Sequence, residues 1–97
     1  MPAYAIASIH VEDPEMMASY SAAVPEIVAR HGGRYLVRGG AVEAVEGDWD
    51  PGRVVVLEFD SVEAARGMFA SPEYREIAPL RQDATQSNLI IVDGYTP

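Results

Sequence analysis

The chain has 97 residues, a length that predicts one domain, residues 1–97, with a modest core. Its 15 acidic and 7 basic residues give a net charge of −8, which disfavours binding to nucleic acid or to an anionic membrane. There is no cysteine, so disulfides, thiolate catalysis and cysteine-based zinc sites are excluded. The start of the chain lacks the features of a signal peptide, and no apolar run reaches membrane-spanning length. We therefore expect a cytoplasmic protein.

A strand followed by a helix is predicted for the first third of the chain. Residues 4–11 (YAIASIHV) are short and apolar and predict the first strand. Asp13 and Pro14 then form a typical helix start, a capping carboxylate followed by proline at the first helical position. Apolar residues recur at helical spacing up to Val28, and the glycine pair at 32–33 predicts the helix end.

Pro25 lies inside this predicted helix and conflicts with it. Proline has no N–H, so the carbonyl of Ser21 loses its partner one turn earlier. We expect either a kink near Ser21 or two shorter helices that meet there.

A hairpin is predicted for the middle of the chain. Residues 34–46 indicate a long strand, interrupted by Gly39 and Gly40, where glycine often marks a bulge or a close backbone approach. The segment 47–52 is a dense cluster of turn residues. Residues 53–59 (RVVVLEF) predict the second strand of the hairpin.

Two short helices and a final strand complete the prediction. The first helix begins after the capping residue Ser61 and runs to about Phe69. The next begins at the cap Ser71, and Pro79 is expected to end it. Residues 89–92 (LIIV) predict the last strand.

The order β-α-β-β-α-β predicts an α+β, ferredoxin-like fold, with both helical crossovers on one face of a four-stranded antiparallel sheet. Residues 54–57 (VVVL) and 89–92 (LIIV) are apolar at consecutive positions, as in strands that are covered on both faces. Because a bare apolar face of four strands exceeds what a monomer usually exposes, a second copy is the expected cover. The sequence therefore predicts a homodimer through the sheet faces. The alternative is that loops or the C-terminal tail cover these positions.

Four blocks follow one another along nearly the whole chain. They are GGRYLVRGG at 32–40, EGDW at 46–49 with Pro51 and Arg53, EFDS at 58–61, and SPEY at 71–74 with Arg81 downstream. In content and order they resemble the bacterial family catalogued as domain of unknown function 1330. Met68-Phe69 departs from the family, which often has a larger aromatic pair there.

The resemblance implies the dimeric α+β barrel fold. Relatives of that fold include cofactor-free monooxygenases, muconolactone-type isomerases, and haem- or chlorite-handling enzymes. The family itself implies no particular reaction, and a fold does not determine a function. The chemistry has to be argued from individual residues.

Arg38 and Glu58 are the first candidates for catalysis. Arg38 lies within a predicted strand among apolar residues, and a buried cation needs a partner. It can orient a carboxylate or enolate oxygen of a ligand, or it can pair internally with Glu58 on the neighbouring strand. Glu58 in turn either accepts a proton from a substrate or remains an ionised member of that pair.

Other candidates are more weakly indicated. His10, at a strand end, is a possible general base or simply a solvated residue. Tyr20, Tyr74 and Arg81 are possible ligand-binding residues, although Tyr20 belongs to the apolar stripe of its helix and is more often core. Tyr74 and Arg81 flank the short helix that is expected to cover the cavity. Trp49, in the turn cluster, is predicted to anchor the dimer.

No cofactor and no metal are expected. The chain has two histidines, and no second histidine lies at ligand spacing from His10. A phosphate-binding glycine loop and a nucleophile elbow are also absent. The leading hypothesis is a homodimer that binds a small anionic or carbonyl-bearing molecule, with a cofactor-independent isomerase or monooxygenase-like activity conceivable. The alternative is a noncatalytic binding protein or a structural, stress-associated dimer module.

Overall fold

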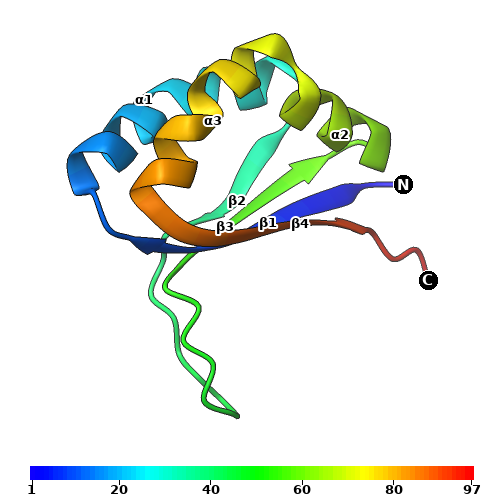
Figure 1. The fold of residues 1–97 in the computed structure, drawn as a ribbon. Helices are drawn as coiled ribbons and strands as arrows, with labels where there is room; N and C mark the ends of the chain where they lie inside the picture. The colour runs from blue at the N-terminus through cyan, green and yellow to red at the C-terminus, as the bar shows by residue number, and fades with distance from the viewer.

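The computed structural model describes all residues from Met1 to Pro97, which form a layer of helices on one face of a sheet (Figure 1). This arrangement confirms the predicted α+β, ferredoxin-like order, with the second crossover divided into two helices. None of the helices is both long and apolar enough to cross a membrane. The elements are β1 (Ala3–Val11), α1 (Pro14–Arg30), β2 (Arg34–Arg38), β3 (Arg53–Phe59), α2 (Val62–Ala70), α3 (Pro72–Ala84) and β4 (Thr85–Asp93).

The sheet has the strand order β2-β3-β1-β4, and each neighbouring pair is antiparallel, as predicted. The pairing of β1 with β3 places Ile9 opposite Arg53 and Ala7 opposite Val55. On its other edge, β1 pairs with β4 along its whole length. Side chains that lie opposite one another point to the same face, so the register assigns each strand residue to the helix side or to the open side.

Each helix begins at its predicted cap. The side chains of Asp13, Ser61 and Ser71 accept hydrogen bonds from the backbone N–H three residues further on, at 3.1, 3.1 and 3.2 Å. These bonds satisfy N–H groups that have no partner within the helix, which is why such residues precede helices.

α1 is one continuous helix, so the alternative of two shorter helices is wrong. The carbonyl of Ser21, which Pro25 leaves without its usual donor, accepts a hydrogen bond from Nη2 of Arg38 at 3.0 Å. A β2 side chain therefore replaces the missing helical bond, because backbone carbonyls in folded proteins are generally paired. The expected kink stays a prediction.

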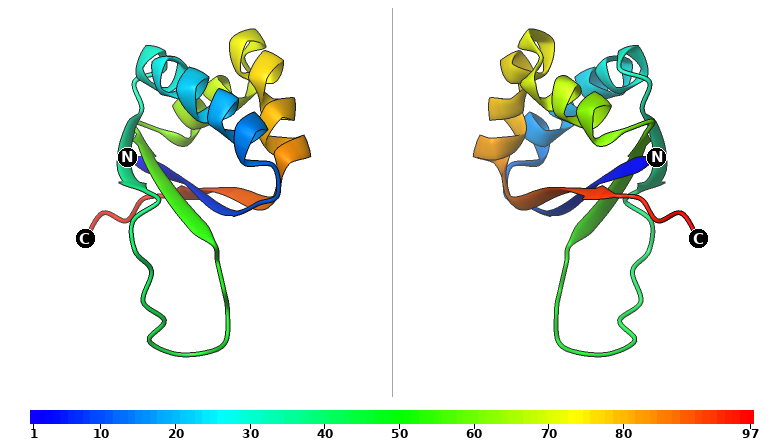
Figure 2. Two further views of the ribbon diagram at one scale, coloured as in Figure 1. Left: turned by 90° about the vertical axis from the view of Figure 1, so that its left-hand side faces the viewer. Right: turned by 90° about the vertical axis from the view of Figure 1, so that its right-hand side faces the viewer.

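β2 is shorter than predicted, because it ends at Arg38 and the segment 39–52 has no regular structure. This β2–β3 loop (residues 39–52) extends away from the sheet on the side opposite the helices (Figure 2). The change occurs at Gly39, whose φ of 73° does not suit a strand. A Cβ there would lie 2.8 Å from Nη1 of Arg53, so a side chain lies close to this glycine, whereas the irregularity in the strand pairing falls earlier, between Tyr35 and Val37.

α3 and β4 are both longer than predicted. The helix continues through Pro79 to Ala84, and the strand begins at once at Thr85. Burial explains the continuation, since Arg81 and Ala84 lie in the interior after the proline and hold the last turns in place. The hydroxyl of Thr85 donates to the carbonyl of Arg81 at 2.7 Å and closes the helix.

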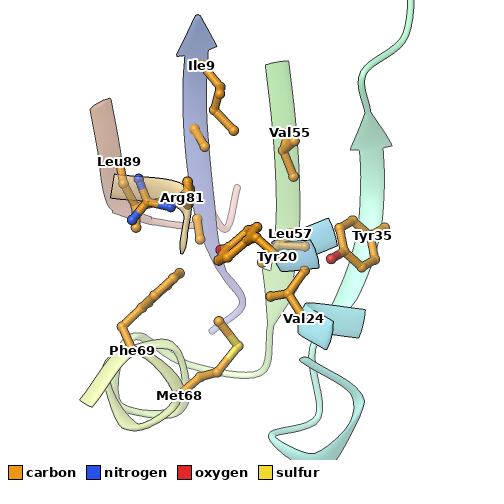
Figure 3. Close-up of a pocket in the computed structure, with 12 residues that line it drawn as sticks. Ile9, Tyr20, Val24, Tyr35, Val55, Leu57, Met68, Phe69, Arg81 and Leu89 are labelled. Carbon is orange, nitrogen blue, oxygen red and sulfur yellow. The ribbon is translucent and has the colours of Figure 1, made fainter. Parts of the chain in front are cut away.

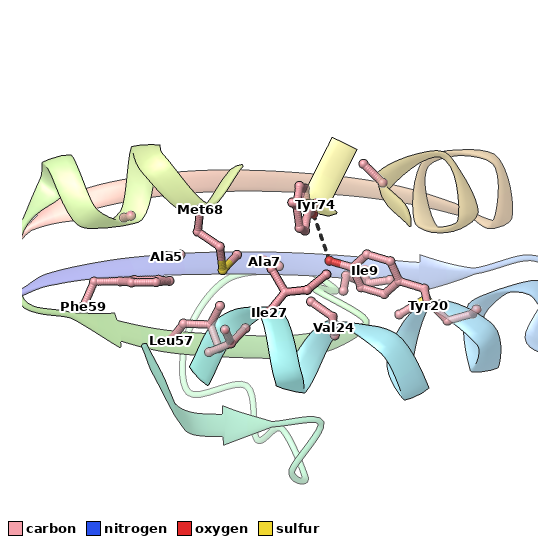
Figure 4. Close-up of a cluster of buried hydrophobic side chains, with 14 of the residues drawn as sticks. Ala5, Ala7, Ile9, Tyr20, Val24, Ile27, Leu57, Phe59, Met68 and Tyr74 are labelled. Atoms are coloured by element: carbon pink, nitrogen blue, oxygen red, sulfur yellow. Dashed lines mark hydrogen bonds between the residues drawn. The ribbon is translucent and has the colours of Figure 1, made fainter. Parts of the chain in front are cut away.

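The core lies between the helix layer and the sheet (Figure 4). Its largest fully buried side chains are Phe59, Met68 and Val28, which come from β3, α2 and α1. Burial of such a side chain contributes about 1.5–3 kcal/mol. Because these residues come from three elements, their contact fixes α1 and α2 on the sheet.

The open face of the sheet carries an apolar patch, as the consecutive apolar residues predict. Val54 and Val56 are half-buried, whereas Ile90 and Val92 are 54% and 42% exposed. Neither the β2–β3 loop nor the C-terminal tail buries the two β4 residues in a single chain. The alternative in which loops or the tail cover all these positions is therefore wrong.

Substitution of two glycines tests the packing of α1 against β3. A Cβ at position 33 would lie 2.7 Å from the Phe59 ring and 2.9 Å from Val28 Cγ1. We expect Gly33→Ala to lower the free energy of unfolding by about 1–3 kcal/mol through overpacking. Gly67→Ala, in α2 with open space around it, is the control and should raise stability by about 0.5–1 kcal/mol. Urea unfolding measures both, and equal midpoints for the two variants would contradict this packing.

Candidate functional site

A hollow with about 40 Å³ of free space lies between the helices and the middle of the sheet (Figure 3). Eleven of the twelve residues around it are hydrophobic, and the remaining one is Arg81. The strands provide its floor and the three helices its walls. The lining residues are Ala5, Ala7, Ile9, Tyr20, Val24, Tyr35, Val55, Leu57, Met68, Phe69, Arg81 and Leu89.

The hollow exists because β1 presents small side chains to the helices. Side chains alternate between the two faces of a strand, so Ala5, Ala7 and Ile9 all point towards the helix layer. Two of these three have only a methyl group. Side chains from the helices fill most of the space above them, and the part they leave free is the hollow.

Arg81 is the one charged residue of the lining, and only 8% of it is exposed. Its Nη1 donates to Ser87 Oγ at 2.6 Å, and its Nη2 donates to the hydroxyl of Tyr74 at 3.5 Å. Its guanidinium carbon lies 5.7 Å from the centre of the Tyr20 ring. All of these partners are neutral, and no carboxylate lies within ion-pair distance.

Tyr20 and Tyr74 join α1 to α3 beside this guanidinium. Their hydroxyl oxygens are 2.9 Å apart (Figure 4), and their rings meet edge to face with centres 6.2 Å apart. Burial raises the pKa of the Tyr20 hydroxyl, Tyr74 raises it further, and Arg81 opposes both effects. Tyr20 therefore remains a neutral phenol that can donate a hydrogen bond.

The charge of Arg81 is retained in this site. Burial acts to lower the pKa of the guanidinium, but Tyr74 and Tyr20 outweigh it, so the pKa is raised overall. A permanent cation beside a neutral phenol suits an anionic or strongly polarised oxygen.

The three residues predicted as weaker ligand-binding candidates are thus brought together. Tyr74 and Arg81 are seven residues apart on α3, which places them on one face of that helix. This spacing was visible in the sequence, whereas the approach of Tyr20 depends on the packing of α1 against α3. Two residues of the site were not predicted from the sequence. Ser87 accepts a hydrogen bond from Arg81, and Tyr35 forms part of the wall.

The predicted internal pair between Arg38 and Glu58 is wrong. Glu58 forms an ion pair with Arg34, which lies directly opposite it on the open face of the sheet. The register of β2 shifts between Tyr35 and Val37, and this irregularity turns Arg38 to the helix side. On that side, Nη2 of Arg38 donates to the carbonyl of Ser21 in α1. Its guanidinium carbon is 4.7 Å from the centre of the Tyr35 ring. The two residues are on opposite faces.

His10 is also on the open face and not in the hollow. It is exposed, and its Nε2 lies 2.9 Å from the carbonyl oxygen of Asp50, while Ser8 Oγ donates to the carbonyl of Pro51 at 2.7 Å. These two contacts hold the end of the β2–β3 loop against β1. No three histidine or acidic side chains lie close enough together to hold a metal ion. The catalytic role of His10 stays a prediction.

Comparison with known proteins places the chain in a family. The profile described as domain of unknown function (DUF1330) matches residues 2–95. The chain belongs to the DUF1330 family. No curated protein is significantly similar to it in sequence.

Several solved structures share the fold of this DUF1330 protein. A protein of unknown function from Rhodopseudomonas palustris is 25% identical over 99% of this chain and 84% of its own, with a TM-score of 0.80. A dimeric ferredoxin-like protein from Jannaschia sp. is 10% identical over 97% and 100%, with a TM-score of 0.73. SnoaB, a cofactor-independent oxygenase from Streptomyces nogalater, is 15% identical over 99% and 95%, with a TM-score of 0.70. The fold is that of the dimeric α+β barrel proteins, as predicted.

The raised pKa of Tyr20 predicts a loss of stability at alkaline pH. Above pH ~10 the unfolded state releases the phenol proton while the folded state retains it, so each such tyrosine lowers stability by about 1.4 kcal/mol per pH unit. Burial also raises the pKa of Tyr35, so the wild-type decline should exceed that of one group. Tyr20→Phe should make the decline less steep in urea unfolding between pH 9 and 11. Tyr95→Phe, at an exposed position, is the control, and identical slopes in all three proteins would contradict the burial of Tyr20.

Proposed function

We propose that the chain forms a homodimer in which each subunit binds a small organic anion or carbonyl compound in the hollow. The observation that carries this proposal is Arg81, a buried guanidinium with neutral partners only. A buried charge is costly unless an opposite charge compensates it. The chain has 15 acidic side chains, yet none pairs with this cation. A bound ligand is the natural source of the compensating charge.

The arrangement of polar groups suggests the general form of the ligand. The guanidinium of Arg81 and the hydroxyl of Tyr20 lie near one another, and apart from Tyr35 the other lining residues are aliphatic, phenylalanine or methionine. Sites of this composition suit a molecule with one carboxylate or carbonyl oxygen and an apolar body. Tyr74 does not line the hollow, but its bonds to Tyr20 and Arg81 orient both groups.

The size of the hollow limits the ligand. Free space of about 40 Å³ is far below the several hundred cubic ångströms of a typical ligand site. Binding of anything larger than a few heavy atoms requires the wall to move. Met68 and Phe69 form part of that wall, and the unbranched methionine side chain adapts readily to new shapes.

A cofactor-independent isomerisation or oxygenation is the enzymatic form of this proposal. The likeness in fold to SnoaB, described as a cofactor-independent oxygenase, supports it. Arg81 can stabilise negative charge on an enolate oxygen of a bound substrate. No histidine or carboxylate lines the hollow, so the substrate would have to enter already ionised. Of the residues predicted to be catalytic, only Arg38 lies on the helix side; His10 and Glu58 do not.

A noncatalytic role is the second candidate. The small free volume and the lack of a proton acceptor in the lining favour a protein that only binds its ligand, or a structural, stress-associated dimer module. Turnover of a bound compound would distinguish the enzyme from both.

The dimer would form through the open face of the sheet. Ile6, Val54, Val56, Ile90 and Val92 make this face apolar, and dimeric proteins of the same fold support the assignment. The β2–β3 loop extends beyond the same face, with Val45 and Trp49 95% and 72% exposed. A partner on this face would lie within reach of the loop, which is consistent with Trp49 as a dimer anchor.

A charge on the open face should separate the subunits. Ile90 is 54% exposed in one chain, so Ile90→Asp costs the folded subunit little but places an unpaired carboxylate in the proposed interface. We expect light scattering to give twice the chain mass of 10.5 kDa for the wild type and the chain mass for the variant. Arg66→Asp, on the helix side, is the control and should remain dimeric. A wild-type protein of 10.5 kDa at micromolar concentration would refute the dimer.

Ligand binding is tested by thermal shift with short straight-chain carboxylates. A ligand at about 100 times its Kd stabilises the folded state by about 2.7 kcal/mol, which corresponds to several degrees of Tm. We expect at least one acid from butyrate to octanoate to raise the Tm of the wild type, and Arg81→Met to lose that increase relative to its own baseline. Arg66→Met, an exposed arginine, should keep it. The binding proposal fails if no acid shifts the wild type, or if Arg81→Met responds as the wild type does.

A further inference from the structure

Three of the chain's arginines belong to the helix side of the sheet or the interior beneath the helices. The seven basic residues are all arginine, and two of them, Arg30 and Arg34, pair with carboxylates. The other five have no carboxylate within ion-pair distance; Arg66 and Arg75 are exposed on helices, whereas Arg38, Arg53 and Arg81 lie on the inner side. In a chain with net charge −8, unpaired cations on the inner side indicate a place for anions.

The register places Arg53 two strands away from Ser87, the residue that Arg81 bonds. Ser87, Ile9 and Arg53 lie directly opposite one another on β4, β1 and β3. Neighbouring strands are about 4.8 Å apart, so the backbones at positions 87 and 53 are separated by roughly 10 Å. Arg81 bonds the Ser87 hydroxyl at one end of this row, and Ile9, in the middle, lines the hollow. Arg53 stands at the other end.

Arg53 makes no hydrogen bond with its side chain within the chain. Its Nε is buried and has no acceptor. The guanidinium lies against the backbone of Gly39, where a Cβ would be 2.8 Å from Nη1. A glycine at this position therefore allows the guanidinium to lie close to the end of β2. Buried donors without an acceptor are rare in folded proteins, and each one calls for an explanation.

Arg38 lies next to this group, one row further along the sheet. It is opposite Val55, which in turn is opposite Ala7, and both of these line the hollow. Its guanidinium packs on the ring of Tyr35, another lining residue, and remains exposed at the surface. Arg38 and Arg53 do not line the hollow, but their positions beside Val55 and Ile9 place them at its rim on the β2 side.

We propose that Arg53 and Arg38 form a second anion subsite, so that the ligand carries an anionic group at each end. This inference rests on the proposed binding at Arg81 and adds the class of the ligand, a small straight-chain dicarboxylate. One carboxylate would bond Arg81 inside the hollow, and the other would accept from the guanidinium of Arg53 at the rim. The hydrocarbon between them would cross the apolar floor above Ala7 and Ile9.

Matched acids distinguish this inference from simple anion binding. Hexanoate and adipate have the same six carbons, and adipate has one more carboxylate. We expect adipate to bind the wild type roughly tenfold more tightly than hexanoate in calorimetry at fixed ionic strength. A tenfold difference in affinity is what one additional charge-assisted contact would contribute. General electrostatics would act the other way, because a protein of charge −8 repels a dianion more strongly than a monoanion.

Variants assign the two ends of the ligand. Arg53→Met should reduce the affinity for adipate to that for hexanoate and leave hexanoate binding unchanged, and Arg53→Lys should restore part of the difference. Because Arg53 makes no hydrogen bond within the chain, its replacement should leave a folded protein, which thermal unfolding checks. Arg81→Met should weaken the binding of both acids, whereas Arg66→Met should change the binding of neither.

Two results overturn the inference in different ways. If hexanoate binds the wild type and adipate binds no more tightly, or if Arg53→Met leaves the preference intact, the second subsite is wrong and binding at Arg81 stands. If neither acid binds, the proposed function fails as well.

Discussion

The alternation of side chains along β1 determines both the interior and the open surface of this protein. On the helix side the strand presents Ala5 and Ala7, whose methyl groups leave space beneath the helices. On the other side it presents Ile6. This side chain belongs to an apolar patch with Val54 and Val56 of β3 and Ile90 of β4. A shift of one residue in the register of β1 would exchange these two sets and remove both the hollow and the proposed dimer surface.

The distribution of charge follows from the same geometry. Most of the acidic side chains are exposed, while the one arginine that lines the hollow, Arg81, is buried. Burial of Arg81 costs stability in the absence of an anion, because its guanidinium loses water without gaining a counter-charge. The hydroxyls of Tyr20, Tyr74 and Ser87 offset part of that cost for Arg81 and also keep its guanidinium oriented.

Much of the fold could be predicted because its signals are local. Asp13, Ser61 and Ser71 precede helices whose first N–H groups they bond, and that chemistry depends on a few neighbouring residues. The partner of Arg38 could not be predicted, because it depends on one irregularity in β2. Without that shift Arg38 would share a face with Glu58; with it, Arg38 bonds the carbonyl that Pro25 leaves free in α1.

The amino-acid sequence by itself determined the order of elements, the family, the apolar second face of the sheet and the residue types available for chemistry. Each of these depends on composition, on periodicity or on motifs of a few consecutive residues. Only the tertiary structure decided which candidates form a site. Tyr20 and Tyr74 are 54 residues apart in sequence, and their hydroxyls meet because α1 packs against α3. Contacts between distant segments depend on how whole elements pack, which no local pattern encodes.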